Sequence, residues 1–299
     1  TVHDFFAVLQ KFKTKRKDLR ALNFLLFDHL GGLNTMLYSL SNGGCLVIVD
    51  DRSPDAVLRA VECYRVDLLP ASPTFINLIL LSEAYKRHDI SSLKTVSYGT
   101  EPMPESTLKR FHQLFPNIQL QQTYGLSELG VLRSKSKSSD SLWVQIGGEE
   151  FQTRVVDGVL HIKAQSAMIG YLNAPSPFTE DGWFNTGDAV LVDGEYFRML
   201  GRQSEIINVG GEKVYPAEVE SVIQGMQGVA EVTVYGEANP IVGSIVCAKV
   251  RLLAGVDKKA MSREIKEACA SRLDNHKVPV KIVIDDAPQY GERFKKSPR

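Results

Sequence analysis

The chain has 299 residues, of which 43% are hydrophobic and 23% charged, a balance typical of globular rather than disordered proteins. Its 35 basic and 35 acidic residues cancel, so no net positive field recruits nucleic acid or an anionic membrane. The longest apolar stretches fall short of the roughly 18 to 20 residues that a membrane span needs, and four scattered cysteines without a Cys-x-x-Cys spacing favour free thiols in a reducing cytoplasm.

Strand-like and helix-like segments alternate in the first part of the chain. Residues 44–51 predict a strand and residues 55–65 a helix, with Pro54 near its start. The alternation continues with strands and helices in turn at residues 66–72, 73–88, 93–102, 104–115 and 117–128. This order predicts βαβ units on a mostly parallel sheet, which binds ligands at the carboxyl ends of its strands. Gly99–Glu101 and Thr123–Gly125 fall at two such ends.

The hydrophobic period changes to two over residues 142–201. Asp157-Gly158 and Asp193-Gly194 each stand between alternating segments, which is a strong hairpin signal. This region is predicted to be a small antiparallel, barrel-like subdomain. The preceding polar stretch, Arg133–Ser141, is interpreted as a solvated connector.

A third composition begins after Arg202. A short strand leads to Gly210-Gly211, a helix then starts near Pro216, and alternating strands and an amphipathic helix follow. The predicted fold class is therefore α/β with a compact α+β C-terminal domain. The predicted parts are residues 1–132 (half of a large α/β domain), 133–201 (β subdomain), 202–205 (hinge) and 206–299 (mobile C-terminal domain).

Three motifs in order carry a specific resemblance: "QTYGLSE" at 122–128, "WFNTGD" at 183–188 and "GRQSEIINVGGEKVYPAEVE" at 201–220. Together with "HLGGLNTMLYSLSNGG" from His29 and "ASPTF" from Ala71, they resemble the adenylate-forming superfamily. Its members are acyl-CoA synthetases, aryl-CoA ligases, nonribosomal-peptide adenylation domains and firefly luciferase. The resemblance runs from residue 1 to about residue 290, and five motifs in this order make it highly specific.

The resemblance implies that a carboxylic acid is joined to the α-phosphate of ATP and the acyl group then passes to a thiol. Glu128 would hold Mg²⁺, which suits a hard cation with few protein carboxylates. Thr123 would donate its hydroxyl to a phosphate oxygen. Tyr124 would lie against the adenine, and Gly125 would let the backbone turn closely beside it. Gly99, Thr100 and Glu101 resemble the adenine-binding loop of the family.

The later motifs imply further roles. Asp188 would accept both ribose hydroxyls, and Arg202 would reach the ribose or a phosphate. Ser204 occupies the position about which the C-terminal domain rotates between the two steps. Lys213 would contact the thiol donor, and His29 would lie beside the acyl group.

The acyl pocket is expected to be walled by residues at several strand and helix ends. These are His29, Asn34, Phe75, Ser97 and Leu129. A lining that mixes apolar side chains with small or polar ones suits an aryl or medium aliphatic acid better than a charged amino acid.

The pattern departs from the family at both ends. The Ser/Thr/Gly-rich phosphate loop of the family should stand just before Thr1, so we expect this polypeptide alone neither to bind pyrophosphate properly nor to adenylate an acid. The family's late catalytic lysine usually follows a glycine, but here Gly291 is followed by Glu292. Spacing does not decide between Lys295 and Lys296, and Lys295 is taken as the candidate.

The leading hypothesis is an AMP-forming acid–thiol ligase that uses ATP, Mg²⁺ and coenzyme A on a small carboxylic acid. The alternative is an adenylation enzyme that loads the phosphopantetheine arm of an acyl carrier protein. A third reading is an inactive fragment that serves as a binding module. In each case we expect a cytoplasmic protein with no nucleic-acid partner and no membrane span.

Overall fold

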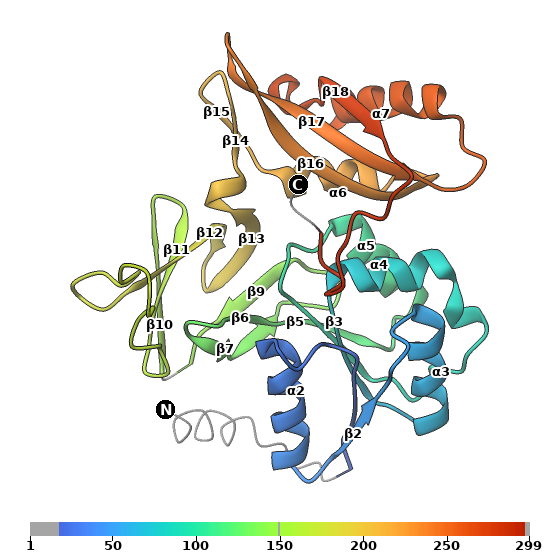
Figure 1. Cartoon of the computed structure of the whole chain (residues 1–299), viewed down its shortest axis with the longest axis vertical. Coiled ribbons are helices and arrows are strands. Elements are labelled where there is room, and N and C mark those ends of the chain that lie inside the picture. The colour runs from blue at the N-terminus through green and yellow to red at the C-terminus, as the bar shows by residue number, and fades with distance from the viewer. Residues whose placement is uncertain (1–17, 149, 297–299) are drawn as a thin grey trace.

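Residues 18–148 and 150–296 are described in the computed structural model, and they form three main sheets (Figure 1). The first sheet is parallel, with the strand order β2-β1-β3-β4-β5. Its strands are β1 (Arg20–Asn23), β2 (Cys45–Ile48), β3 (Leu68–Ala71), β4 (Thr95–Tyr98) and β5 (Gln119–Gln122). The predicted parallel sheet is confirmed, and β1 is an addition that the sequence patterns did not predict.

The helices that accompany this sheet begin at well-defined caps. They are α2 (Leu30–Ser41), α3 (Pro54–Tyr64), α4 (Pro73–Ser82) and α5 (Glu105–Leu114), with a short 3₁₀ turn η1 (Ala84–Lys86) after α4. A serine precedes the first-turn proline of both α3 and α4, and its hydroxyl accepts a backbone N–H of that turn. The serine-proline pairs therefore fix where these helices start, and thus where the β-to-α loops lie.

The second sheet is antiparallel and curled, with the order β10-β11-β12-β13-β9-β8. Its strands are β8 (Ser134–Ser136), β9 (Trp143–Ile146), β10 (Phe151–Val156), β11 (Val159–Ala164), β12 (Phe184–Asp193) and β13 (Tyr196–Arg202). Asp157 and Gly158 both have positive φ angles, of 51° and 78°, as the predicted two-residue hairpin turn requires. A small ribbon of β6 (Tyr124–Leu126) and β7 (Gly130–Leu132) joins the two sheets.

The stretch that was interpreted as a solvated connector is partly a strand, so that interpretation was wrong for its centre. Ser134 Oγ donates to the carbonyl of Gln122 at 3.0 Å, and the N–H of Gln122 donates to Ser136 Oγ at 2.8 Å. Lys135, between them, points to solvent. The serine–lysine alternation is a period-two pattern, and the serines satisfy backbone groups at the free edge of β5.

The third sheet forms a separate C-terminal unit (Figure 1). Its elements are η2 (Gln203–Glu205), β14 (Ile207–Val209), β15 (Glu212–Val214), α6 (Pro216–Gln224), β16 (Val229–Asn239), β17 (Gly243–Leu252), α7 (Lys258–Arg272), η3 (Asn275–Lys277) and β18 (Lys281–Ile284). Helices α6 and α7 bury Ile223 and Ile265 against β16 and β17. The strand order is β15-β14-β17-β16, with β18 parallel to β17.

The segment after β18 returns to the first domain, where Figure 1 shows it in red beside α4. The ring of Phe294 lies 5.0 Å from that of Phe75 and 5.8 Å from that of Phe24, measured between centroids. The core of the parallel-sheet domain is therefore completed by a residue from the far end of the chain.

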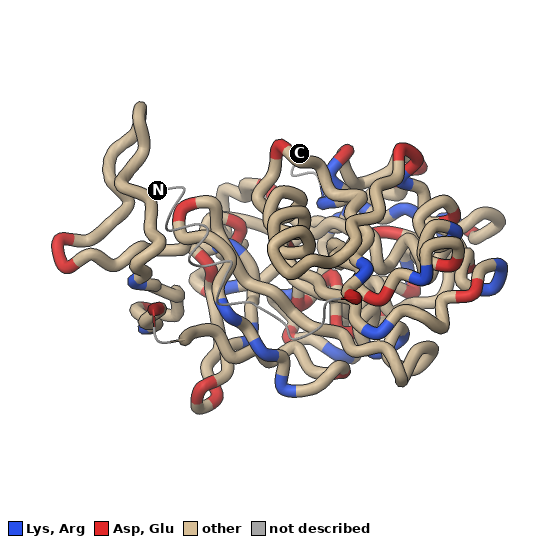
Figure 2. Tube along the Cα trace, turned by 90° about the horizontal axis from the view of Figure 1, so that it is seen from below, with Lys and Arg blue, Asp and Glu red and all other residues tan. Residues whose placement is uncertain are grey.

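The distribution of charged residues over the surface agrees with the balanced composition. Basic and acidic residues are interspersed over the described chain (Figure 2), in keeping with the equal numbers of the two kinds. Within residues 18–148 and 150–296, no helix combines the length and the apolarity that crossing a bilayer demands. The domain limits given above remain predictions.

We predict that Leu69→Ala destabilises the protein by about 2–5 kcal/mol, because Leu69 is completely buried on the central strand β3 and its removal leaves a cavity. Leu40→Ala is the matched control, since Leu40 is 58% exposed on α2 and is expected to change stability by at most roughly 0.5 kcal/mol. Urea unfolding measures both, and equal losses would contradict the assigned core.

Candidate active site

Two strand-end loops of the parallel sheet lie in close contact. Thr123 follows β5, and both its backbone N–H and its hydroxyl donate to the carbonyl of Tyr98, at 2.7 and 3.1 Å. A Cβ atom on Gly99 would lie only 2.6 Å from the carbonyl oxygen of Thr123 and 2.7 Å from its Oγ1. Glycine is thus required at position 99, and it lets the two loops approach within contact distance.

The next residue of this loop is strained. Thr100 is β-branched and exposed, yet its φ angle is +75°, a conformation that such residues rarely adopt. The strain persists because the neighbours hold the loop on both sides. Glu101 accepts the N–H of Thr74 with one oxygen, at 2.7 Å, and the N–H of Lys296 with the other, at 3.1 Å. Its carboxylate faces α4 and the C-terminal segment.

A tyrosine, an aspartate and an arginine form a bonded cluster at the neighbouring strand end. The hydroxyl of Tyr124 donates to Asp188 Oδ2 at 2.5 Å, and Arg202 Nε contacts Asp188 Oδ1 at 3.0 Å. Burial raises the pKa of Asp188 above its ordinary value, although Tyr124 and Arg202 both oppose the shift. Burial, followed by the charge of Asp188, raises the pKa of Tyr124.

The carboxylate of Asp188 can accept more hydrogen bonds than this cluster supplies. Arg202 Nη1 also donates to the carbonyl of Thr186 at 2.7 Å, so its guanidinium is held near the start of β12. A carboxylate offers about four lone-pair positions, and two of those of Asp188 are used by Tyr124 and Arg202. The free positions suit the hydroxyl groups of a ligand. The ring of Tyr124 itself is buried in the core beneath the curled sheet.

The loop after Tyr124 brings one carboxylate into the same region. A Cβ atom on Gly125 would lie 2.9 Å from the backbone of Gly130 and Val131, so the tight ribbon needs glycine there. Glu128 accepts the hydroxyl of Tyr171 at 2.7 Å through Oε1. Among the described residues no cluster of three metal-ligating side chains forms. A single carboxylate with one oxygen to spare fits a Mg²⁺ ion that also binds phosphates and water.

A cavity beside the loop of Thr100 contains His29 and Lys295. His29 caps α2, and its Nδ1 accepts the N–H of Gly31 at 3.2 Å, so the neutral ring carries its proton on Nε2. That nitrogen lies 3.4 Å from Lys295 Nζ. While Lys295 is protonated, two donors face each other, an arrangement that an oxygen acceptor from a ligand would satisfy. Burial lowers the pKa of both groups.

The two candidate lysines point in different directions. Lys296 Nζ binds Glu220 of α6 at 2.5 Å, within the C-terminal unit. Lys295 instead lies in the cavity, where the charges of Glu101 and Arg202 act on its pKa in opposite directions. The geometry therefore favours Lys295 for a role at the cavity.

The remaining predicted residues are not all brought to this cavity. Phe75 is fully buried in the core of the first domain, and Leu129 is fully buried beneath the curled sheet. Ser97 on β4 and Asn34 on α2 are partly buried and are not among the residues that line the cavity. These four assignments to an acyl pocket stay predictions.

Two predicted residues lie on the C-terminal side. Lys213 is exposed on β15, and Ser204 is exposed in η2 between β13 and β14. The end of β13 touches the loop of the parallel sheet, because a Cβ atom on Gly201 would lie 4.0 Å from Pro102 Cγ. The strand that carries Arg202 therefore meets the loop that carries Gly99 and Glu101.

Several residues around the site gave no signal in the sequence. Arg52 and Phe294 line the cavity, and Arg52 Nη1 donates to the carbonyl of Glu292 at 3.0 Å. Tyr171 holds Glu128 from a loop without periodicity. Ser72 gave a partial signal, since a serine before a proline predicts a helix cap.

The chain is similar in sequence to a family of AMP-binding enzymes and to known CoA ligases. The sequence pattern of the family described as "AMP-binding enzyme" matches residues 2–172, and that of "AMP-binding enzyme C-terminal domain" matches residues 218–292. An indoleacetate–CoA ligase of Aromatoleum aromaticum is 28% identical, with 91% of this chain and 57% of that protein covered. A feruloyl-CoA synthase of Amycolatopsis sp. is 30% identical, with 90% of this chain and 58% of that protein covered.

Solved structures agree on the fold. The anthranilate CoA ligase AuaEII in complex with anthranoyl-AMP has a TM-score of 0.85 at 19% identity, covering 98% of this chain and 61% of that one. The o-succinylbenzoate CoA synthetase of Bacillus subtilis, bound to its acyl-adenylate, has a TM-score of 0.75 at 25% identity, covering 95% and 61%. The chain spans somewhat over half the length of the relatives it matches.

We predict that Tyr124→Phe costs more stability at pH 8 than at pH 3, a pH below the ordinary pKa of 3.8 and therefore also below the raised pKa of folded Asp188. Burial raises the pKa of Asp188 in the folded protein above 3.8, so as pH rises the unfolded chain loses the carboxyl proton of Asp188 before the folded protein does. The free energy of unfolding therefore falls as pH rises from about 3.8 through the folded pKa. The lost hydrogen bond is charge-assisted once Asp188 ionises, so the cost grows from about 1 to about 1.5–3 kcal/mol.

Urea unfolding at the two pH values measures this difference. Tyr64→Phe is the matched control, since Tyr64 is 54% exposed and is expected to show no pH-dependent change. A Tyr124→Phe cost that is equal at both pH values would refute the coupling between Tyr124 and Asp188.

Proposed function

The chain belongs to the AMP-binding enzyme family, and from this membership we propose that its protein activates a small carboxylic acid with ATP and transfers the acyl group to coenzyme A. The observation that carries the proposal is the cavity in which His29 and Lys295 present facing donors beside the loop of Thr100. The relatives named above as CoA ligases support the same reaction class.

In the first step the carboxylate attacks the α-phosphate of ATP and pyrophosphate leaves. Negative charge accumulates at the meeting point of two anions, so donors fixed in advance lower the barrier. Lys295 and His29 would hold the acid's carboxylate oxygen between them, with Lys295 also compensating charge on the phosphate. No proton needs to be removed, because the attacking carboxylate is already ionised.

The nucleotide would lie along the strand ends. Asp188 would accept the ribose hydroxyls with its remaining lone pairs, while Arg202 stays anchored at Thr186. Thr123 would donate to a phosphate oxygen, and the loop at Gly99 would border the adenine.

The other nucleotide contacts would come from the loop after Thr123. The backbone of Tyr124 and Gly125 would lie on the far side of the base, because the ring of Tyr124 is buried in the core. Glu128, oriented by Tyr171, would hold Mg²⁺, whose charge would offset that of the phosphates.

The second step needs a path for the thiol. Rotation of the C-terminal unit at Ser204 would withdraw Lys295 and bring Lys213 toward the thiol donor. Ser204 is exposed in the short η2 segment between two strands, where a backbone rotation meets little packing. A cytoplasmic location, where coenzyme A and ATP are available, remains part of this proposal.

The acid itself is proposed to be aryl or medium aliphatic. The cavity that holds His29 is lined on one part by the apolar Phe24, Leu25, Leu26 and Phe294, and on another by the cations Arg52, Arg293 and Lys295. The apolar part suits the body of such an acid, and the cations suit its carboxylate. The acids in the names of two relatives, indoleacetate and ferulate, are aromatic, which supports the aryl class.

We predict that Lys295→Ala lowers the rate of acyl-adenylate formation by roughly 10²–10³-fold, the usual effect of losing one fixed donor to a developing charge. Lys296→Ala is the matched control and should change that rate by only a few fold, because its side chain binds Glu220 rather than the cavity. Pyrophosphate exchange with the complete enzyme measures both. Equal effects of the two substitutions would show the assignment of Lys295 to be wrong.

A second experiment identifies the acceptor. With the acid that gives the fastest exchange from a panel of aryl and aliphatic acids, thioester formation is compared for coenzyme A and a phosphopantetheinylated carrier protein. We expect coenzyme A to be the better acceptor. Preference for the carrier protein would replace the proposal with a loading enzyme, and calorimetry that finds no Mg²⁺-dependent ATP binding would reduce the protein to a binding module.

A further inference from the structure

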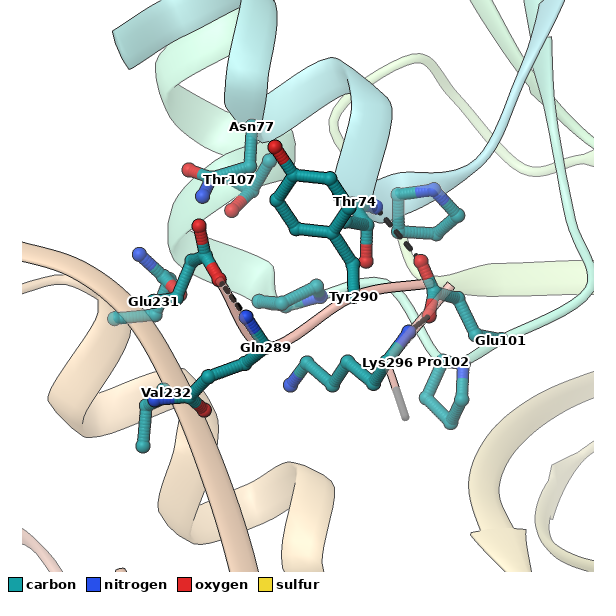
Figure 3. Close-up of a pocket in the computed structure, with 13 residues that line it drawn as sticks. Thr74, Asn77, Glu101, Pro102, Thr107, Glu231, Val232, Gln289, Tyr290 and Lys296 are labelled. Carbon is teal, nitrogen blue, oxygen red and sulfur yellow. Dashed lines mark hydrogen bonds between the residues drawn. The ribbon is translucent and has the colours of Figure 1, made fainter. Parts of the chain in front are cut away.

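The segment from Gln289 to Lys296 lies in the seam between the C-terminal unit and the parallel-sheet domain (Figure 3). Its first residue is fixed to the C-terminal unit: Gln289 N–H donates to Glu231 at 2.6 Å, and Gln289 Oε1 accepts the hydroxyl of Thr233 at 2.7 Å. Its last described residue is fixed to the same unit by the Lys296–Glu220 ion pair. Both ends of the segment are therefore bonded to the C-terminal unit.

The opposite side of the segment is held by the residues that cap α4. Ser72 Oγ accepts the N–H of Phe75 at 3.0 Å, as an N-cap does, and donates its own proton to the carbonyl of Phe294. The same hydroxyl thus serves the helix and the segment, and Ser72 is buried at the contact.

Glu101 also binds both α4 and the segment, one with each of its two carboxylate oxygens. One accepts the N–H of Thr74 in the first turn of α4, and the other accepts the N–H of Lys296, as the dashed lines of Figure 3 mark. A carboxylate is the favoured partner for the N–H of Thr74, since the N-terminal turn of a helix carries partial positive charge, and its second oxygen remains available to the N–H of Lys296. The carboxylate of Glu101 therefore bridges the helix and the segment.

Phe294 C=O and Lys296 N–H are the backbone groups on either side of Lys295. Ser72 holds the first and Glu101 holds the second, so the backbone of Lys295 is fixed while its side chain extends to His29. We propose that Glu101 is a positioning residue for Lys295, which departs from the adenine contact that the family resemblance implied. This inference rests on the proposed function of Lys295 in acyl-adenylate formation.

The activity test is a double-mutant cycle on the complete enzyme. Glu101→Ala should lower the rate of acyl-adenylate formation about 100-fold, the loss expected when a reacting group is misplaced by about 1 Å. In a Lys295→Ala background the same substitution should cause almost no further loss, because Glu101 acts through Lys295. Thioester formation from a supplied acyl-adenylate should stay within about threefold of wild type. The proposal would be overturned in favour of an adenine contact if Glu101→Ala lowered the rate just as much in the Lys295→Ala background and also raised the KM for ATP.

A second measurement does not depend on turnover, so it separates failure of this inference from failure of the proposed function. Hydrogen–deuterium exchange should be about tenfold faster or more over residues 291–296 in Glu101→Ala, because the N–H of Lys296 loses its acceptor and the segment loses one of its backbone links to the parallel-sheet domain. Glu101→Gln, which keeps one acceptor oxygen, should fall between wild type and Glu101→Ala, and it decides the question if the alanine variant fails to fold. Glu264→Ala, at an exposed position of α7, is the control that should leave exchange unchanged. Wild-type exchange in both Glu101 variants would overturn the proposal.

Discussion

The arrangement of the site depends on one long-range contact, the packing of residues 289–296 against the start of α4. Phe294 packs against Phe24 and Phe75 in the core of the parallel-sheet domain, and both lie more than two hundred residues earlier in the chain. Because the same segment is bonded to the C-terminal unit, this contact joins the two parts, together with the bonds from Asn77 to Ala230 and from Glu105 to Ser221. It also delivers Lys295 to His29, which no contact within either part could do.

The second constraint is the close approach of the loops at the strand ends. Glycine at position 99 brings the loop of Thr123 within contact distance, and the strained Thr100 is held in place by the bonds of Glu101 on its other side. The Tyr124–Asp188–Arg202 cluster then ties the curled sheet to the same edge. Donors for anions and acceptors for hydroxyl groups are thereby gathered along a single edge of the parallel sheet.

Much of the fold and of the candidate site could be predicted from local sequence patterns. For each part that could not be predicted, there is a physical reason. The βαβ alternation, the Asp157-Gly158 hairpin and the glycines at the strand ends depend on neighbouring residues, so the sequence patterns indicated them correctly. The strand at Ser134–Ser136 was missed because its inward side chains are polar and satisfy a sheet edge rather than fill a core. The choice between Lys295 and Lys296 could not be made from spacing, because it is decided by Glu220 and by Ser72, which are distant in sequence.

The central claim is that the strand-end loops and the C-terminal segment meet around one acyl-adenylate. The most direct measurement is the hydrogen-exchange footprint of a stable acyl-adenylate analogue on the complete enzyme. The account predicts joint protection of residues 99–101, 123–128, 186–202 and 291–296, since all four would contact or close over one ligand. Protection confined to the strand ends, with residues 291–296 exchanging as in the free protein, would contradict it.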